Sequence, residues 1–189
     1  MKHKHIVFFL EERSAKALLD TLLPRLLPPD AFSFHCIPFD GKSALQRRMP
    51  RKLCAWQKQD TFVVLHDQDS GNCNTLKTKL TGLCAEAGKP DTLVRIACRE
   101  LESWYLADLC AVEKGLEVKG LARHQDSSKY RDPDRQPNPA KTLQQLTSNK
   151  YQKVAGSRAI GPHLDLNNTR SASFRNFITG VRRIAGLLS

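Results

Sequence analysis

The sequence predicts an α/β fold with a parallel sheet of about four strands flanked by helices, followed by a basic, mainly α-helical C-terminal extension. Short apolar runs alternate with longer amphipathic segments, and alternation of this length favours a parallel sheet covered on both faces. The net charge of +11 is unevenly distributed along the chain. Residues 1–118 include 17 basic and 15 acidic residues, whereas residues 119–189 include 13 basic and 4 acidic residues. We therefore predict an α/β domain over 1–118 and a basic helical extension over 119–189, packed on that domain.

Four apolar runs predict the strands, and the segments between and after them predict helices. The run at 61–66 is β-branched and aromatic up to its final histidine, as in a strand that is buried on both faces. Ser14 and Ser43 precede amphipathic segments and are predicted helix N-caps. The predicted strands cover 5–10, 31–39, 61–66 and 92–97, and the predicted helices cover 14–27, 43–57, 72–87 and 99–115.

The strand-helix alternation ends after Gly120. Residues 122–138 are polar and rich in proline, which predicts a long loop with few apolar anchors that is mobile without substrate. Short helices are predicted at 139–147 and 150–159. Apolar residues fall on roughly one stripe of 171–188, which predicts a final amphipathic helix.

Composition narrows the class of protein. No apolar run has the length of a signal peptide or a membrane span, so we expect a cytoplasmic protein without membrane contact. The six cysteines form no Cys-x-x-Cys pair, which favours reduced thiols and argues against a zinc site. The basic excess indicates a polyanionic partner such as nucleic acid, with a solubilising surface as the alternative.

Acidic side chains follow three of the predicted strands. Glu11 follows the first, Asp67 and Asp69 follow the third, and Glu100 follows the fourth. Side chains two residues apart on an extended chain point the same way, and parallel strands end at one edge, so we expect these carboxylates to converge. Mg²⁺ or Mn²⁺ would relieve their repulsion. Two alternatives remain: the aspartates belong to an ordinary polar turn, or the glutamates only stabilise the start of a helix. The side chain of His66 is predicted to point to the opposite face, into the core.

Basic residues are predicted to hold phosphate groups. The stretch 41–59 contains six Lys and Arg residues and no acid. It lacks the upstream glycine of a phosphate-binding loop, so no ATP site is predicted. The competing interpretation is a solvated basic surface. The predicted nucleic-acid-binding residues are Lys42, Arg47, Arg48, Arg51, Lys153, Arg158, Arg170 and Arg175.

A glutamate after the first strand and an Asp-x-Asp after the third resemble the Toprim fold, which topoisomerases, primases and OLD-family nucleases share. The chain is more closely similar, over nearly its whole length, to the Toprim-like family called domain of unknown function 4276. Five stretches carry this resemblance: Phe-Leu-Glu-Glu-Arg-Ser at 9–14, Phe-Asp-Gly-Lys at 39–42, Leu-His-Asp-Gln-Asp-Ser at 65–70, Ile-Ala-Cys-Arg-Glu-Leu-Glu-Ser-Trp-Tyr-Leu-Ala-Asp at 96–108, and Arg-Ser-Ala-Ser-Phe-Arg at 170–175.

The resemblance implies roles for the acids. Glu11 matches the Toprim glutamate, and the two aspartates match its metal-binding aspartates. Many Toprim domains have glycine after the glutamate, where this chain has Glu12, so either acid is a candidate for the site. Glu100 matches a further acid of OLD-type nucleases, and Glu102 is expected to pair with a basic residue instead.

The resemblance also implies an activity. It implies metal-dependent cleavage of nucleic acid phosphodiesters with Mg²⁺ or Mn²⁺, and a setting in anti-phage defence beside a partner ATPase. The main alternative is a Toprim-like binding or regulatory module without catalysis. A primase-like nucleotidyl transferase is a further alternative, although the sequence shows no pocket for a nucleotide base.

Overall fold

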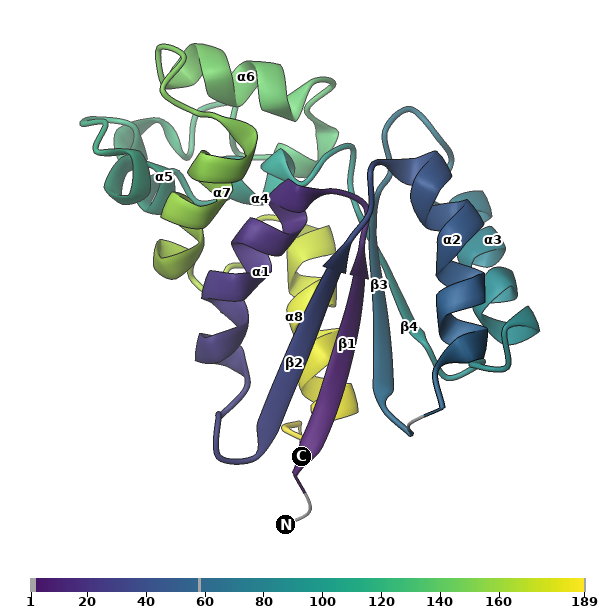
Figure 1. The fold of residues 1–189 in the computed structure, drawn as a ribbon. Helices are drawn as coiled ribbons and strands as arrows, with labels where there is room; N and C mark the ends of the chain where they lie inside the picture. The colour runs from purple at the N-terminus through teal and green to yellow at the C-terminus, as the bar shows by residue number, and fades with distance from the viewer. Residues whose placement is uncertain (1–2, 58, 189) are drawn as a thin grey trace.

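The structure is a computed structural model that describes residues 3–57 and 59–188, so Lys58 of the basic stretch lies outside it. Its centre is a four-stranded sheet in the order β2-β1-β3-β4 (Figure 1). The strands are β1 (Lys4–Leu10), β2 (Phe32–Pro38), β3 (Thr61–Asp67) and β4 (Leu93–Ala97). All three strand pairs are parallel, so the carboxyl ends lie at one edge. The predicted α/β class and its four strands are confirmed.

Long helices cover both faces of the sheet. They are α1 (Arg13–Leu26), α2 (Lys42–Ala55), α3 (Cys73–Glu86) and α8 (Ala172–Ala185). Successive residues of β1 face opposite sides, so Ile6 and Phe8 lie in one hydrophobic cluster and Val7 and Phe9 in the other. The first cluster includes residues of α1 and α8, and the second includes residues of α2 and α3. Figure 1 shows the two helix layers on either side of the sheet.

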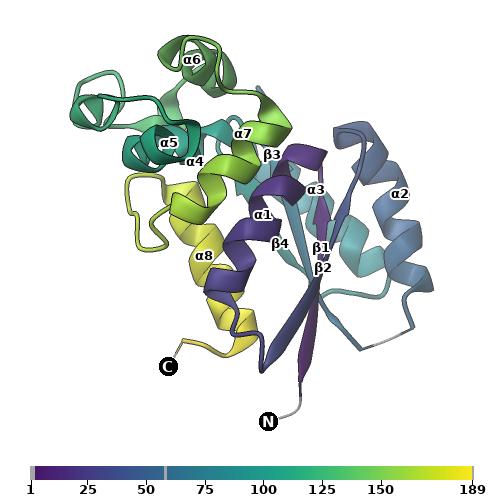
Figure 2. The same ribbon diagram turned by 60° about the vertical axis from the view of Figure 1, so that its left-hand side comes forward.

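Four shorter helices follow β4. They are α4 (Glu102–Leu106), α5 (Leu109–Leu116), α6 (Pro139–Leu146) and α7 (Lys153–Ile160). The prediction of one helix over 99–115 is wrong, because Asp108 interrupts it and caps α5 by accepting a hydrogen bond from the N–H of Ala111 at 3.0 Å. α7 packs along α1, as both ribbon views show (Figures 1 and 2). None of the described helices has the length and apolarity that crossing a bilayer needs.

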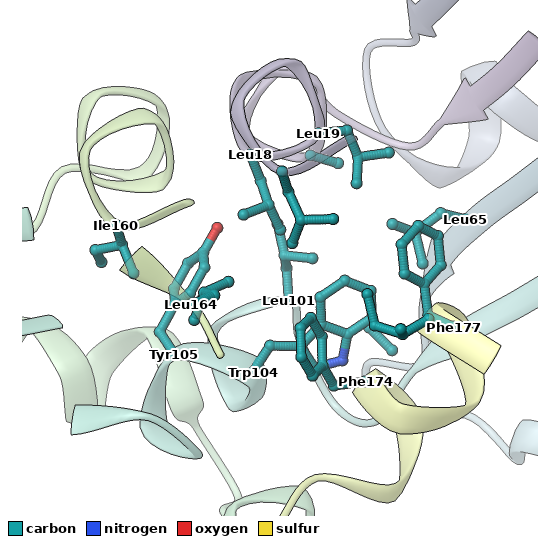
Figure 3. Close-up of a cluster of buried hydrophobic side chains, with 14 of the residues drawn as sticks. Leu18, Leu19, Leu65, Leu101, Trp104, Tyr105, Ile160, Leu164, Phe174 and Phe177 are labelled. Carbon is teal, nitrogen blue, oxygen red and sulfur yellow. The ribbon is translucent and has the colours of Figure 1, made fainter. Parts of the chain in front are cut away.

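Trp104 of α4 joins α8 to the sheet. Its ring packs against Phe174 and Phe177 (Figure 3), with 5.2 Å between ring centroids in each pair. Its indole N–H donates to the hydroxyl of Ser173 at 2.9 Å. Burying the ring with its N–H paired avoids the cost of an unsatisfied donor. Residues beyond 118 therefore share one hydrophobic cluster with β1 and β3.

Two predicted helix caps are wrong. The cap of α1 is Glu12, and Ser14 is buried inside the first turn. The cap of α2 is Gly41, one residue before Lys42, and not Ser43. Gly41 has a φ of 91°, which favours glycine, and its N–H donates to the carbonyl of Glu11 at 3.0 Å. Both helices therefore start directly from the strand ends, before the chain reaches the serines.

The segment 122–138 is better anchored than its sequence predicts. It contains two 3₁₀ turns, η1 (Ala122–His124) and η2 (Pro133–Arg135). The amide of the buried Gln125 accepts from the N–H of Leu109 at 2.7 Å and donates to the carbonyl of Leu106 at 3.0 Å. Tyr130 is also buried. Few apolar side chains anchor the segment, as predicted, but the buried amide of Gln125 adds a polar anchor that a hydropathy pattern does not reveal. The mobility of the segment stays a prediction.

Because α5 packs closely on α7, adding one methyl group at Gly115 should measurably lower the stability of the protein. A Cβ on Gly115 would lie 2.6 Å from the carbonyl oxygen of Ala159 and 2.8 Å from the Cα of Ile160. Both are backbone atoms, so the two helices must separate. Gly115→Ala should lower the free energy of unfolding by about 1–3 kcal/mol, measured by urea denaturation.

The matched control is Gly82→Ala in α3, where nothing lies within 4 Å of the added Cβ. There the substitution should raise the free energy of unfolding by about 0.5–1 kcal/mol, because alanine favours the helix. Equal effects of the two substitutions would contradict the close approach of α5 and α7.

Candidate functional site

Glu11 joins the ends of β1 and β3. Its N–H donates to the carbonyl of Leu65 at 3.3 Å, which continues the sheet ladder past the end of β1. Its Oε2 accepts a hydrogen bond from the N–H of Asp67 at 2.9 Å and lies 2.9 Å from Nδ1 of His66. The residue is only 8% exposed. Two neighbours on β3 therefore hold this carboxylate at the carboxyl edge of the sheet.

Asp67 is the last residue of β3 and is 7% exposed. Burial raises the pKa of its carboxyl group well above the usual value, and the charges of Glu11, Glu102 and Glu12 raise it further. A hydrogen bond from the backbone of Leu101 lowers it in part. Several carboxylates thus act on one buried aspartate, which is the convergence that the strand-end acids predict.

Glu102, the first residue of α4, is almost fully buried within this group. Its Oε1 accepts a hydrogen bond from the hydroxyl of Tyr151 at 2.9 Å. Burial raises the pKa of Glu102, whereas the charge of Lys153 and the hydrogen bond of Tyr151 lower it. Glu102 forms no ion pair among the described residues, so its pairing with a basic residue stays a prediction.

Lys153, the first residue of α7, brings a positive charge from the C-terminal part of the chain to the acids. Its Nζ lies 3.3 Å from Oε1 of Glu12. Burial lowers the pKa of Lys153, but the charges of Glu102 and Glu12 outweigh burial and raise the pKa overall. Sequence periodicity gave no sign of this contact, because 141 residues separate the partners.

Glu100 has a different partner. Its Oε2 accepts a hydrogen bond from the N–H of Ala140 at 2.9 Å, in the first turn of α6. This contact satisfies one of the free N–H groups at a helix start. The catalytic role of Glu100 stays a prediction, and Glu102 is the acid after β4 whose charge raises the pKa of Asp67.

Asp69 contacts other partners than Asp67. The chain leaves the extended conformation after β3: Asp69 has a φ of 54°, and its N–H donates at 2.7 Å to the carbonyl of Arg99, whose φ is 60°. Alternation of side chains holds only in extended backbone, so the prediction that both aspartates leave the strand side by side fails here. Oδ2 of Asp69 instead lies 3.0 Å from Nζ of Lys42, and this hydrogen bond raises the pKa of Lys42.

His66 links the two sides of this edge. The prediction that it points away from Asp67 into the core overlooked a polar contact, because its Nδ1 meets Glu11 and its Nε2 lies 3.4 Å from Nε2 of Gln46. Burial lowers the pKa of His66, but the hydrogen bond and charge of Glu11, together with the backbone of Asp67 and the charge of Asp69, outweigh burial and raise the pKa overall. His66 is thus a buried polar partner of the site.

Two hollows open at the strand ends. One, of about 490 Å³, is lined by Glu11, Glu12 and Lys153 and lies where α1, α2 and α7 begin. The other, of about 310 Å³, lies between α2 and α3 and is lined by Lys42 and Asp69 among other residues. Each hollow therefore combines acidic and basic side chains.

The donor chemistry suits a divalent cation, because Mg²⁺ and Mn²⁺ prefer carboxylate oxygens. The arrangement of the donors is less suited: within 3–57 and 59–188, no three His, Cys, Asp or Glu side chains are placed to hold a metal ion. Lys42 and Lys153 compensate carboxylates at this edge instead. Metal binding by Glu11, Asp67 and Asp69 stays a prediction.

The other predicted phosphate-binding residues do not line either of these two hollows. Arg170 forms an ion pair with Asp126 at 3.0 Å, which engages its guanidinium group. Arg48 lies 3.9 Å from Asp40. The remaining four are exposed without an ion pair among the described residues: Arg47 and Arg51 on α2, Arg158 on α7 and Arg175 on α8.

The raised pKa of Asp67 predicts that replacing it with the neutral asparagine stabilises the protein to an extent that depends on pH. When the folded pKa of an acid lies above its unfolded value, stability falls as pH rises through the interval between the two. Asp67→Asn should therefore raise the melting temperature at neutral pH without metal, by about 2–4 °C for each kcal/mol recovered, with the gain shrinking towards pH 4.

Asp91→Asn is the control, since Asp91 is exposed just before β4, at the opposite edge of the sheet. Its melting temperature should follow that of the wild type at every pH. A lower melting temperature for Asp67→Asn at neutral pH would show that repulsion on Asp67 is already compensated.

The whole fold resembles solved structures of the C-terminal region of the OLD protein of Xanthomonas campestris pv. campestris. The structure phased with mercury gives a TM-score of 0.52 at 13% identity and covers 96% of each chain. The structure phased with platinum gives 0.53 at 15% identity, covering 97% of this chain and 95% of that one. At such identities the likeness concerns the fold alone.

No curated protein gives a significant match. The family described as "Domain of unknown function (DUF4276)" matches residues 10–182, which contain the last residue of β1, the other three strands and most of α8. The resemblance inferred from the sequence is thereby confirmed. The chain belongs to the DUF4276 family and has a Toprim-like α/β fold.

Proposed function

We propose that this chain is a metal-dependent nuclease that hydrolyses phosphodiester bonds of nucleic acid. The observation that carries the proposal is the group of Glu11, Asp67 and Glu102 at the carboxyl edge of a parallel sheet, with Lys42 and Lys153 beside it. Sites in open α/β folds form at this edge. A polyanionic substrate needs cationic groups to hold it, and acids to bind metal for its cleavage.

Glu11, Asp67 and Asp69 are the proposed ligands of Mg²⁺ or Mn²⁺, with Glu100 or Glu102 as a further acid. A bound divalent cation lowers the pKa of water and offsets the charge that develops on the phosphate. The donor set consists of carboxylate oxygens, which such cations prefer as ligands. The burial of Asp67 excludes bulk water, which strengthens electrostatic interactions there.

Lys42 and Lys153 are the proposed phosphate-binding residues nearest the acids. Each is now paired with a carboxylate, Asp69 and Glu12 respectively. Phosphate oxygens offer the same ammonium groups an equivalent charge-assisted hydrogen bond. The two lysines come from opposite sides of the sheet edge, so a bound strand would be held from both sides.

The exposed arginines of α2 extend this cationic surface. α2 contains five basic residues and no acid, and its N-terminal residue is Lys42 itself. Contacts of this kind bind the phosphate backbone without reading sequence. The partner ATPase and the role in anti-phage defence rest on the family resemblance alone and belong to the same proposal.

A binding module without catalysis is the second candidate. The pairing of Lys42 with Asp69 and of Lys153 with Glu12 favours it, because each lysine already offsets the charge of an acid at the site. The two functions differ in one observable property, cleavage that depends on Mg²⁺ or Mn²⁺.

Cleavage assays with purified protein test the proposal. We expect the wild type to cut DNA or RNA only with Mg²⁺ or Mn²⁺, and Asp67→Ala and Asp69→Ala each to lower the rate at least about 100-fold by removing a metal ligand. Asp91→Ala, outside the site, should cut at the wild-type rate. Wild-type rates in both site variants would refute the proposed metal ligands.

The same assay separates the two acids that follow β4. Glu102→Gln should lose activity to a similar degree, whereas Glu100→Gln should mainly weaken the start of α6. The reverse order of activities would assign the catalytic acid to Glu100, as the family resemblance implies.

Salt dependence tests the role of α2. Changing Arg47, Arg48 and Arg51 together to Glu should weaken nucleic-acid binding and flatten the plot of log affinity against log salt by about 0.9 for each phosphate that the helix no longer neutralises. The control for net charge changes three exposed cations outside α2 to Glu: Lys114, Lys119 and Arg131. An unchanged slope in the α2 variant would assign α2 to another partner or to solvent.

A further inference from the structure

A pocket of about 240 Å³ lies along the outer edge of β4. β4 is the last strand in the sheet order, so its outer edge has no strand partner among the described residues. α3 borders the pocket on one face of the sheet and α8 on the other. The proposed metal ligands Glu11, Asp67 and Asp69 do not line it.

The polar residues that line this pocket are two cations, an amide, a hydroxyl and two thiols: Lys77, Arg95, Asn176, Ser173, Cys73 and Cys98. Lys77 of α3, Arg95 of β4 and Asn176 of α8 contribute side chains, and none of the described acidic residues lines the pocket. Neither Lys77 nor Arg95 has an ion-pair partner in the part of the chain that the structure describes. The nearby acid Asp134 is engaged, because its carboxylate accepts hydrogen bonds from Ser171 and from the N–H of Ser173 at the start of α8.

Arg95 is fixed in place without a counter-charge. Its Nε donates to the carbonyl of Asn176 at 2.9 Å and its Nη1 donates to the carbonyl of Val94 at 3.0 Å. Nη2 has no hydrogen-bond partner among the described residues and lies 2.6 Å from where a Cβ of Gly180 would stand. The glycine therefore leaves room for the guanidinium group, which is held ready by two carbonyl groups.

The electrostatics around Arg95 are unfavourable for a free cation. Burial lowers its pKa, and the charge of Arg183 lowers it further. Lys77 adds a third positive charge on the other side of the pocket. An anion bound here would offset this repulsion, whereas an unpaired charge in a partly buried place costs free energy.

A guanidinium at a sheet edge also protects that edge from pairing with another chain. This role explains the hydrogen bond from Arg95 to Val94. It does not account for Lys77 and Asn176, which line the same pocket from α3 and α8. Three donors from three elements around one concave space are better explained by a ligand with several acceptor oxygens.

We propose that the pocket on the β4 edge binds a phosphate group through Lys77, Arg95 and Asn176. A phosphate group presents several acceptor oxygens and a negative charge, which matches a guanidinium, an ammonium and an amide from three directions. The group belongs either to a free nucleotide or to the backbone of a nucleic acid strand. The second source rests on the proposed nuclease function, and the first is independent of it.

Calorimetric titration without divalent cations tests the pocket separately from cleavage. Inorganic phosphate should bind the wild-type chain, and Lys77→Gln should weaken that binding about tenfold or more, the effect of one charge-assisted hydrogen bond. Lys114→Gln on α5 makes the same change of charge at an exposed position outside the pocket and should bind phosphate as the wild type does.

Arg95→Gln should abolish phosphate binding, and a melting curve shows whether the variant remains folded. Lys77 is exposed on α3, so Lys77→Gln stays informative if Arg95→Gln unfolds. Absence of phosphate binding to the wild type, or equal binding by the wild type and Lys77→Gln, would overturn the proposal.

Two further titrations identify the source of the phosphate group. If AMP displaces bound inorganic phosphate and a short single-stranded oligonucleotide does not, the pocket is assigned to a free nucleotide. Competition by the oligonucleotide, with weaker oligonucleotide binding in Lys77→Gln, assigns it to a nucleic acid backbone. Because no step requires cleavage, a chain that binds phosphate but lacks nuclease activity would refute the proposed function and leave this site standing.

Discussion

The burial of several carboxylates at the end of β3 is the constraint on which the surrounding arrangement depends. A buried carboxylate is costly unless donors or cations compensate it. The N–H of Asp67 and the ring of His66 compensate Glu11, and the hydroxyl of Tyr151 compensates Glu102. Lys153 supplies the positive charge. α7, which carries Lys153, must therefore lie against α1 for the edge of the sheet to be stable.

This constraint also divides the site into two sides. The turn after β3 sends Asp69 towards α2, where Lys42 meets it, while Asp67 remains buried with the acids of β1 and α4. Left-handed backbone at two non-glycine residues, Asp69 and Arg99, costs free energy that the hydrogen bond between them offsets in part. Strain of this kind commonly marks functional sites, which agrees with the position of this turn between two hollows.

Local patterns in the sequence were sufficient for the sheet and for the convergence of acids. Apolar runs such as 61–66 identify strands because both of their faces are buried, and parallel order then brings Glu11 and Asp67 to one edge. Alternation of side chains did not extend to Asp69, because backbone conformation after a strand is not encoded by hydropathy. The N-caps at Ser14 and Ser43 failed for a related reason, since the strand ends decide where each helix begins.

Contacts between distant segments were beyond such patterns. The ion pair of Lys153 with Glu12 depends on how α7 packs against α1, and local sequence patterns do not predict that packing. The same holds for His66, whose buried position was predicted but whose contact with Glu11 was not. The basic excess indicated only a polyanionic partner, whereas one lysine of the basic segment, Lys153, lies beside the acids of the sheet edge.

The packing of α8 on Trp104 has a consequence for how the chain reaches its native state during synthesis. α8 is the last described helix, yet Phe174 and Phe177 complete the cluster that begins with β1. A growing polypeptide that has just produced β4 and α4 therefore still exposes a large aromatic surface. That surface stays open to chaperones or to premature association until α8 has been synthesised, so this hydrophobic cluster cannot close before then.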